Sequence, residues 1–110
     1  MSGDNPYRKT IEHLEEIANL LGRGSSAEER AVGADMLDDL GLHATAGICR
    51  HKKTAKHAAM HGGLLKAYAT AKDKERRASL RMFADSYGIA QNWEIVSYID
   101  ATIPLTERGR

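Results

Sequence analysis

A basic segment in the middle of the chain carries the residues best suited to bind a ligand. On a helical wheel, the cationic and imidazole side chains between Arg50 and His61 fall largely on one side, opposite a narrow apolar stripe. Lysine and arginine attract carboxylates and phosphates, and each one placed near a nucleic-acid phosphate releases condensed counterions. We therefore predict a partner-binding basic face that contacts nucleic acid or an acidic protein surface, made of Arg50, Lys52, Lys53, Lys56, His57, Arg76 and Arg77.

Two histidines in this segment support an alternative hypothesis, a helical metal-binding protein. His57 and His61 are four residues apart, which places both on one face of a helix, as two ligands of one metal ion would be. Cys49 is displaced around the same helix and cannot complete the set locally. Further ligands would have to come from another helix or another subunit. In the favoured hypothesis the protein needs no cofactor.

The residues give little support for an enzyme. Cys49 lies beside Arg50 and His51, a setting that can lower the pKa of a thiol and make it reactive. A single cysteine next to an apolar residue is more often a small core residue, which is the interpretation we favour. Neighbouring carboxylates such as Glu28 and Glu29 point apart on a helix. We predict a non-enzymatic binding or regulatory module without catalytic residues.

The charge of the chain is distributed in blocks of opposite sign. From residue 1 to 42, nine acidic residues stand against four basic ones, whereas residues 43–82 contain ten Lys and Arg against two acidic residues. The net charge is only +1. Such asymmetry can create an anion-binding face, or it can let acidic helices pack against basic ones. The sequence leaves open whether Asp35, Asp38 and Asp39 neutralise the basic face.

Length and composition indicate one soluble domain. The 110 residues are 42% hydrophobic, as expected of a single globular domain over residues 1–110. The apolar residues are mainly Ala, Leu and Ile, with one Trp and one Phe. Because alanine buries little area, we expect a homo-oligomer to complete the burial.

The cellular location is expected to be the cytoplasm. The lone cysteine excludes an intramolecular disulfide. The first residues contain no apolar segment typical of a secretory signal, and no stretch approaches the roughly 20 apolar residues of a membrane span. We therefore expect no membrane partner.

Hydrophobic periodicity predicts an all-α fold, a compact bundle of four to five helices. The first helix begins at Asn5-Pro6 and ends at Gly22 or Gly24. A second begins with the capping box Ser26–Glu29 and ends at Gly41, with a packing reason expected for Gly33 in its interior. Three further helices are expected. The first covers residues 44–61 and is ended by Gly62-Gly63, the second covers residues 64–87 and is bent or broken near Asp73, and the third covers residues 89–103. The tail 105–110 is expected to fray.

Two further patterns concern the middle and the end of the chain. Residues 36–50 have the outline of a helix-turn-helix, but Leu37 and Gly47 occupy positions where a small residue and a branched apolar anchor are usual. Trp93 lies on the apolar stripe of the last helix with Val96, so we expect it in the core.

Overall fold

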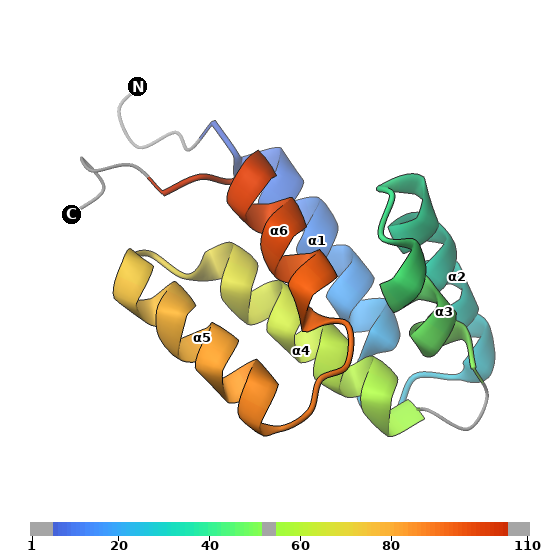
Figure 1. The fold of residues 1–110 in the computed structure, drawn as a ribbon. Coiled ribbons are helices and arrows are strands. Elements are labelled where there is room, and N and C mark those ends of the chain that lie inside the picture. The colour runs from blue at the N-terminus through green and yellow to red at the C-terminus, as the bar shows by residue number, and fades with distance from the viewer. Residues whose placement is uncertain (1–5, 52–54, 106–110) are drawn as a thin grey trace.

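The computed structural model describes residues 6–51 and 55–105, and within these ranges the chain forms helices and no strands (Figure 1). The all-α prediction is confirmed, but the predicted number of helices is too low, because six are present in the described residues. The predicted fraying of the tail falls mostly outside those residues. The helices are α1 (Arg8–Leu21), α2 (Ala27–Asp39), α3 (His43–Arg50), α4 (Ala55–Thr70), α5 (Lys74–Ser86) and α6 (Asn92–Thr102).

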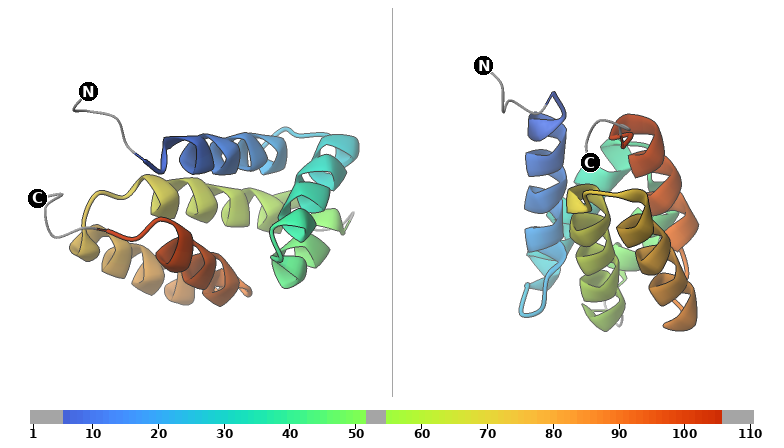
Figure 2. Two further views of the ribbon diagram at one scale, coloured as in Figure 1. Left: turned by 90° about the horizontal axis from the view of Figure 1, so that it is seen from above. Right: turned by 90° about the vertical axis from the view of Figure 1, so that its left-hand side faces the viewer.

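Helix α4 is the centre of the arrangement. It lies between α1 and α5, and it runs antiparallel to α5 (Figures 1 and 2). Helices α2 and α3 pack together at one end of the α1–α4 pair, and α6 contacts α3, α4 and α5. None of the helices in the described part of the chain combines the length and hydrophobicity needed to cross a lipid bilayer.

The starts of α2 and α5 are set by local capping, and the capping box of α2 was predicted from the sequence. The Ser26 hydroxyl accepts the backbone N–H of Glu29 at 3.0 Å, and the Glu29 carboxylate accepts the backbone N–H of Ser26 at 2.8 Å. At α5, the Asp73 carboxylate accepts the backbone N–H of Arg76 at 2.7 Å. The predicted break near Asp73 is therefore confirmed.

The predicted helix over residues 44–61 is wrong. Helix α3 ends at Arg50, where His51 adopts an extended backbone, and α4 begins at Ala55. Helix α4 then continues through Gly62-Gly63, which was expected to interrupt it. An ideal Cβ at Gly62 would lie 3.1 Å from Cβ of Leu21 and 3.2 Å from the backbone oxygen of Ala18. Gly62 therefore allows α4 and α1 to approach closely, and it does not end the helix.

The two neighbouring glycines of α4 give a prediction on stability. Gly62→Ala is expected to lower the free energy of unfolding by about 1–2 kcal/mol, because the backbone of α1 must shift to admit the methyl group. Gly63→Ala is expected to raise it by up to ~1 kcal/mol, because an added Cβ there has no atom of the described residues within 4 Å. Urea denaturation of both variants measures this difference. Equal effects of the two substitutions would contradict the assigned helix packing.

The core lies along α1 and α4 and is completed by the other helices. Its largest fully buried side chains include Leu14, Ile17, Leu21, Leu37, Leu65, Tyr68, Ile95 and Ile99. Gly33 lies at a close contact between helices, as the sequence suggested, since an added Cβ would lie 3.0 Å from the Leu21 side chain.

Trp93 was wrongly expected in the core and is 58% exposed. The buried face of α6 is formed by Ile95, Val96 and Ile99, and Trp93 lies outside it.

The start of α3 depends on a residue far away in sequence. Its N-cap residue, Leu42, offers no side-chain hydrogen bond. Instead the Glu94 carboxylate, from α6, accepts the backbone N–H of Ala44 at 3.1 Å and that of Thr45 at 2.7 Å. The Thr45 hydroxyl also donates to it at 2.6 Å. A negative group at a helix N-terminus is favourable both as a hydrogen-bond acceptor and toward the helix dipole. Glu94 therefore joins α3 to α6.

Candidate binding face on α4 and α5

Arg50, the first predicted residue of the basic face, is held by acidic residues of α2. Its guanidinium donates to Asp35 at 2.6 Å and to Asp38 at 2.7 Å. Asp38 also bonds the His43 ring at 2.8 Å, and these hydrogen bonds from His43 and Arg50 lower the pKa of Asp38. Asp35 and Asp38 of α2 therefore neutralise Arg50 of α3. This agrees with the alternative, left open by the sequence, that an acidic helix pairs with part of the basic face.

Arg77 is buried and does not belong to an exposed face. Its side chain is 4% exposed, and it donates to Asp100 at 3.1 Å and to the backbone oxygen of Ile103 at 2.7 Å. The guanidinium also lies 5.0 Å from the centre of the Tyr68 ring. This arginine links α5 to the end of α6, and its charge is paired with Asp100 of the same chain.

The remaining predicted cations divide into two groups. Lys52 and Lys53 lie outside the described residues. Lys56, His57 and Arg76 are exposed, and each lines a surface cavity beside α4. Arg76 directly precedes Arg77 in sequence, but on the helix it points to the solvent-facing side, which explains why the two arginines have different environments.

Two adjoining cavities form a groove between α4 and α5, which we call the α4–α5 groove. One, of about 660 Å³, extends from Lys56 and His57 to Tyr87. The other, of about 530 Å³, surrounds the turn between the two helices, and Gly63 and Ala67 line both cavities. The α4–α5 groove therefore extends along most of the length of this antiparallel helix pair.

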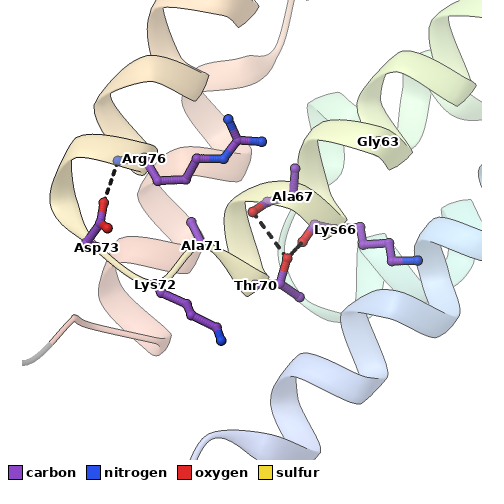
Figure 3. Close-up of a pocket in the computed structure, with 8 residues that line it drawn as sticks. All are labelled: Gly63, Lys66, Ala67, Thr70, Ala71, Lys72, Asp73 and Arg76. Atoms are coloured by element: carbon purple, nitrogen blue, oxygen red, sulfur yellow. Dashed lines mark hydrogen bonds between the residues drawn. The ribbon is translucent and has the colours of Figure 1, made fainter. Parts of the chain in front are cut away.

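The second cavity contains cations that the sequence analysis did not include. Lys66 and Lys72 line it with Arg76, and Figure 3 shows the three side chains extending away from the Asp73 carboxylate. Among the described lining residues of both cavities, Asp73 is the one acidic residue, and its carboxylate bonds the backbone N–H of Arg76. Within the described part of the chain, the side chains of Lys56, Lys66, Lys72 and Arg76 form no ion pair.

The predicted metal pair is not arranged as a site. His61 is buried, and its Nδ1 lies 2.7 Å from the backbone oxygen of His57. Since that oxygen can only accept, Nδ1 carries the proton, and Nε2 is then free to accept the backbone N–H of Gln91 at 3.3 Å. The His57 side chain is exposed, whereas the His61 ring is buried and both of its nitrogens already form hydrogen bonds. In residues 6–51 and 55–105 no three His, Cys, Asp or Glu side chains are grouped as metal ligands.

The burial of His61 gives a prediction on pH dependence. Desolvation lowers its pKa below the ordinary 6.5. The unfolded chain therefore binds this proton more readily, and stability is expected to fall as the pH drops below about 6.5, by at most about 1.4 kcal/mol per pH unit. Urea denaturation across this pH range measures the slope, with His61→Gln as the comparison. Identical slopes for the wild type and the variant would show that His61 does not contribute.

Cys49 is a core residue, as the favoured interpretation expected. Its side chain is fully buried, and burial raises the pKa of the thiol to about 12 in spite of the neighbouring Arg50. A thiol of this kind is protonated and inaccessible near neutral pH, so Cys49 is not an activated nucleophile.

Comparisons of the chain with protein-family models, curated proteins and solved structures give no match.

The main site feature that sequence reasoning missed is the apolar part of the groove. Phe83 and Tyr87 are 50% and 64% exposed, and their rings stack with centroids 4.3 Å apart. They follow Arg76 and Leu80 at helical spacing on α5, which was the available signal. Sequence spacing alone does not distinguish such a stripe from one that faces the core.

Proposed function

We propose that this protein is a small non-enzymatic binding module, acting in the cytoplasm, that contacts an acidic partner through the basic side chains of α4 and the start of α5. The observation that carries the proposal is a division among the cations. Arg50 and Arg77 are paired with acidic residues of the same chain. Lys56, Lys66, Lys72 and Arg76 line the α4–α5 groove without an ion pair in the described part of the chain.

Cations without an internal partner are available to bind a negatively charged surface. An exposed ion pair contributes about 0.2–1 kcal/mol, so four together supply on the order of 1–4 kcal/mol and also accelerate association. This contribution weakens with salt, because exposed charges are screened over roughly 10 Å at 0.1 M ionic strength. The proposed contact is therefore specific in location and sensitive to ionic strength.

The predicted homo-oligomer remains a second part of the proposal. Val32, Met82 and Trp93 are exposed and do not line the α4–α5 groove, and they are apolar surface that self-association would bury. Sedimentation velocity of the full chain measures the oligomeric state. A monomer at all concentrations would remove self-association from the proposed function.

Charge removal at matched arginines tests the binding proposal. The probes are a fluorescein-labelled Glu-rich peptide and a labelled DNA duplex, titrated at about 50 mM salt and followed by fluorescence anisotropy. Arg76→Gln is expected to weaken binding to at least one probe about 3- to 5-fold, and the triple variant Lys66→Gln, Lys72→Gln, Arg76→Gln more than tenfold.

Arg50→Gln is the control, since it removes the same charge from a side chain already paired with Asp35 and Asp38. Its affinity is expected to stay within about twofold of the wild type. The proposal is wrong if neither probe binds at low salt, or if Arg50→Gln weakens binding as much as Arg76→Gln does.

A further inference from the structure

We infer that the α4–α5 groove binds an amphipathic helix of a partner protein, with an apolar stripe along one face and Asp or Glu residues toward both ends. This inference rests on the proposed function and specifies the partner. Its basis is the arrangement of three kinds of residue along the groove, which are apolar, small and cationic.

The middle of the groove is apolar. The cavity of about 660 Å³ is lined by Met60 and Leu64 of α4, Leu80 and Phe83 of α5, and Ile89. The half-exposed Phe83 ring, stacked on Tyr87, gives a partner an aromatic surface to bury. Aromatic residues of this kind carry much of the binding energy in protein interfaces. A nucleic acid backbone would leave this surface in contact with water.

Small residues on α4 leave room for a helix. Ala59, Gly63 and Ala67 follow one another at intervals of four residues, so they lie in one line along the helix and all face the groove. In the part of the chain that the structure describes, an added Cβ at Gly63 would have nothing within 4 Å. A line of small residues lets a second helix approach at short distance, with its own side chains in the space that larger residues would fill.

The cations lie at the two ends of the apolar middle. Lys56 and His57 are at the start of α4, beside Tyr87 at the end of α5. Lys66, Lys72 and Arg76 are at the opposite end, around the turn between the helices (Figure 3). A bound helix with acidic residues near both ends and apolar residues between them is complementary to this pattern. Since α5 has 13 residues, the bound segment is about three to four turns long.

A second copy of this chain is a poorer occupant. Its acidic helices are α1, α2 and α6, and each already buries its apolar side chains in its own core, which are Leu14, Ile17 and Leu21 in α1, Ala34 and Leu37 in α2, and Ile95, Val96 and Ile99 in α6. None of these helices can present an apolar stripe together with its acidic residues unless the fold opens. A helix that carries both an apolar stripe and acidic residues near its ends must therefore come from a different protein.

A substitution that fills the groove tests the inference. Gly63→Leu places a side chain in the open space on α4, and it is expected to keep the fold because leucine is a better helix former than glycine. Gly47→Leu is the matched control, since Gly47 is also a helical glycine and an added Cβ there meets none of the described residues within 4 Å, but it lies on α3. Circular dichroism and thermal unfolding establish that both variants are folded.

The probes are a labelled helix-forming peptide with leucines on one face and glutamates at both ends, a scrambled peptide of the same composition, and a DNA duplex. We expect the amphipathic peptide to bind the wild type at least tenfold more tightly than the scrambled one. We also expect Gly63→Leu to lose at least tenfold in affinity for it, while Gly47→Leu is unchanged.

Several outcomes would overturn the inference while leaving the proposed function in place. Equal binding of the two peptides, or binding that Arg76→Gln weakens and Gly63→Leu does not, would indicate contact through charge alone. Tighter binding of the duplex than of the amphipathic peptide would indicate a nucleic acid. Self-association that Gly63→Leu abolishes would indicate a second copy as the occupant. Absence of binding to all three probes would overturn both proposals.

Discussion

Replacing Asp100 with alanine is expected to lower the free energy of unfolding by about 2–4 kcal/mol, since it removes the acidic partner of a buried arginine. The Arg77 side chain is 4% exposed and depends on Asp100 and on the backbone oxygen of Ile103. Among the described residues, Nε of Arg77 already has no hydrogen-bond partner. The Tyr68 hydroxyl also donates to Asp100 at 3.0 Å, so it loses an acceptor as well. The Asp100 side chain is 46% exposed, and solvent screening favours the lower end of this range.

A double variant distinguishes two contributions to the free energy of unfolding, the penalty for leaving Arg77 buried without its carboxylate and the stabilisation provided by the Arg77–Asp100 pair. Asp100→Ala combined with Arg77→Met removes both charges and keeps most of the buried volume. It is expected to be more stable than Asp100→Ala alone, because no guanidinium is then left buried without its carboxylate. Urea denaturation of the wild type, both single variants and the double variant measures this. A double variant less stable than either single one would contradict the assigned role of Arg77.

Replacing Glu94 with alanine is the second substitution with a large expected effect, a loss of about 2–3 kcal/mol of unfolding free energy. The carboxylate accepts the backbone N–H groups of Ala44 and Thr45 and the Thr45 hydroxyl. Leu42 offers no side-chain replacement at the N-cap of α3. Two backbone donors at the start of this short helix would lose their acceptor.

The conservative variant Glu94→Gln is the control for this effect. It keeps an amide oxygen that can accept one or two of these hydrogen bonds but removes the negative charge, so about half of the loss is expected. Hydrogen exchange provides a second measurement, because the amides of α3 are expected to exchange faster in Glu94→Ala than those of α1. Uniform acceleration of exchange in all helices would contradict a role specific to α3.

Elements fixed by local interactions could be predicted from the sequence. The apolar stripe of α1 and the capping box of α2 lie within the helices that they define, and the Asp73 cap marks the start of α5. The separation of α3 from α4 could not be predicted in this way. Gly62 is read as a helix breaker in the sequence, and only its contact with Ala18 and Leu21 explains why the helix continues.

The candidate site was predictable only in part, for a similar reason. The sequence identified a basic segment and placed Lys56, His57 and Arg76 in it. It could not show that Arg50 reaches Asp35 and Asp38, or that Arg77 reaches Asp100, because these partners are 12 to 23 residues away. Lys66 and Lys72 belong to the same surface only because the turn after α4 brings them beside Arg76.

The most direct test of the central claim is to map the contact of an acidic peptide on the unmodified protein by NMR. The backbone amide signals of the ¹⁵N-labelled full chain are followed during titration with the amphipathic peptide that has glutamates at both ends. We expect the largest shifts at residues of the α4–α5 groove, including Lys56, Gly63, Lys66, Arg76 and Phe83, and small shifts in α2 and α3. Shifts centred on Arg50 and α3, or no shifts at low salt, would contradict the account.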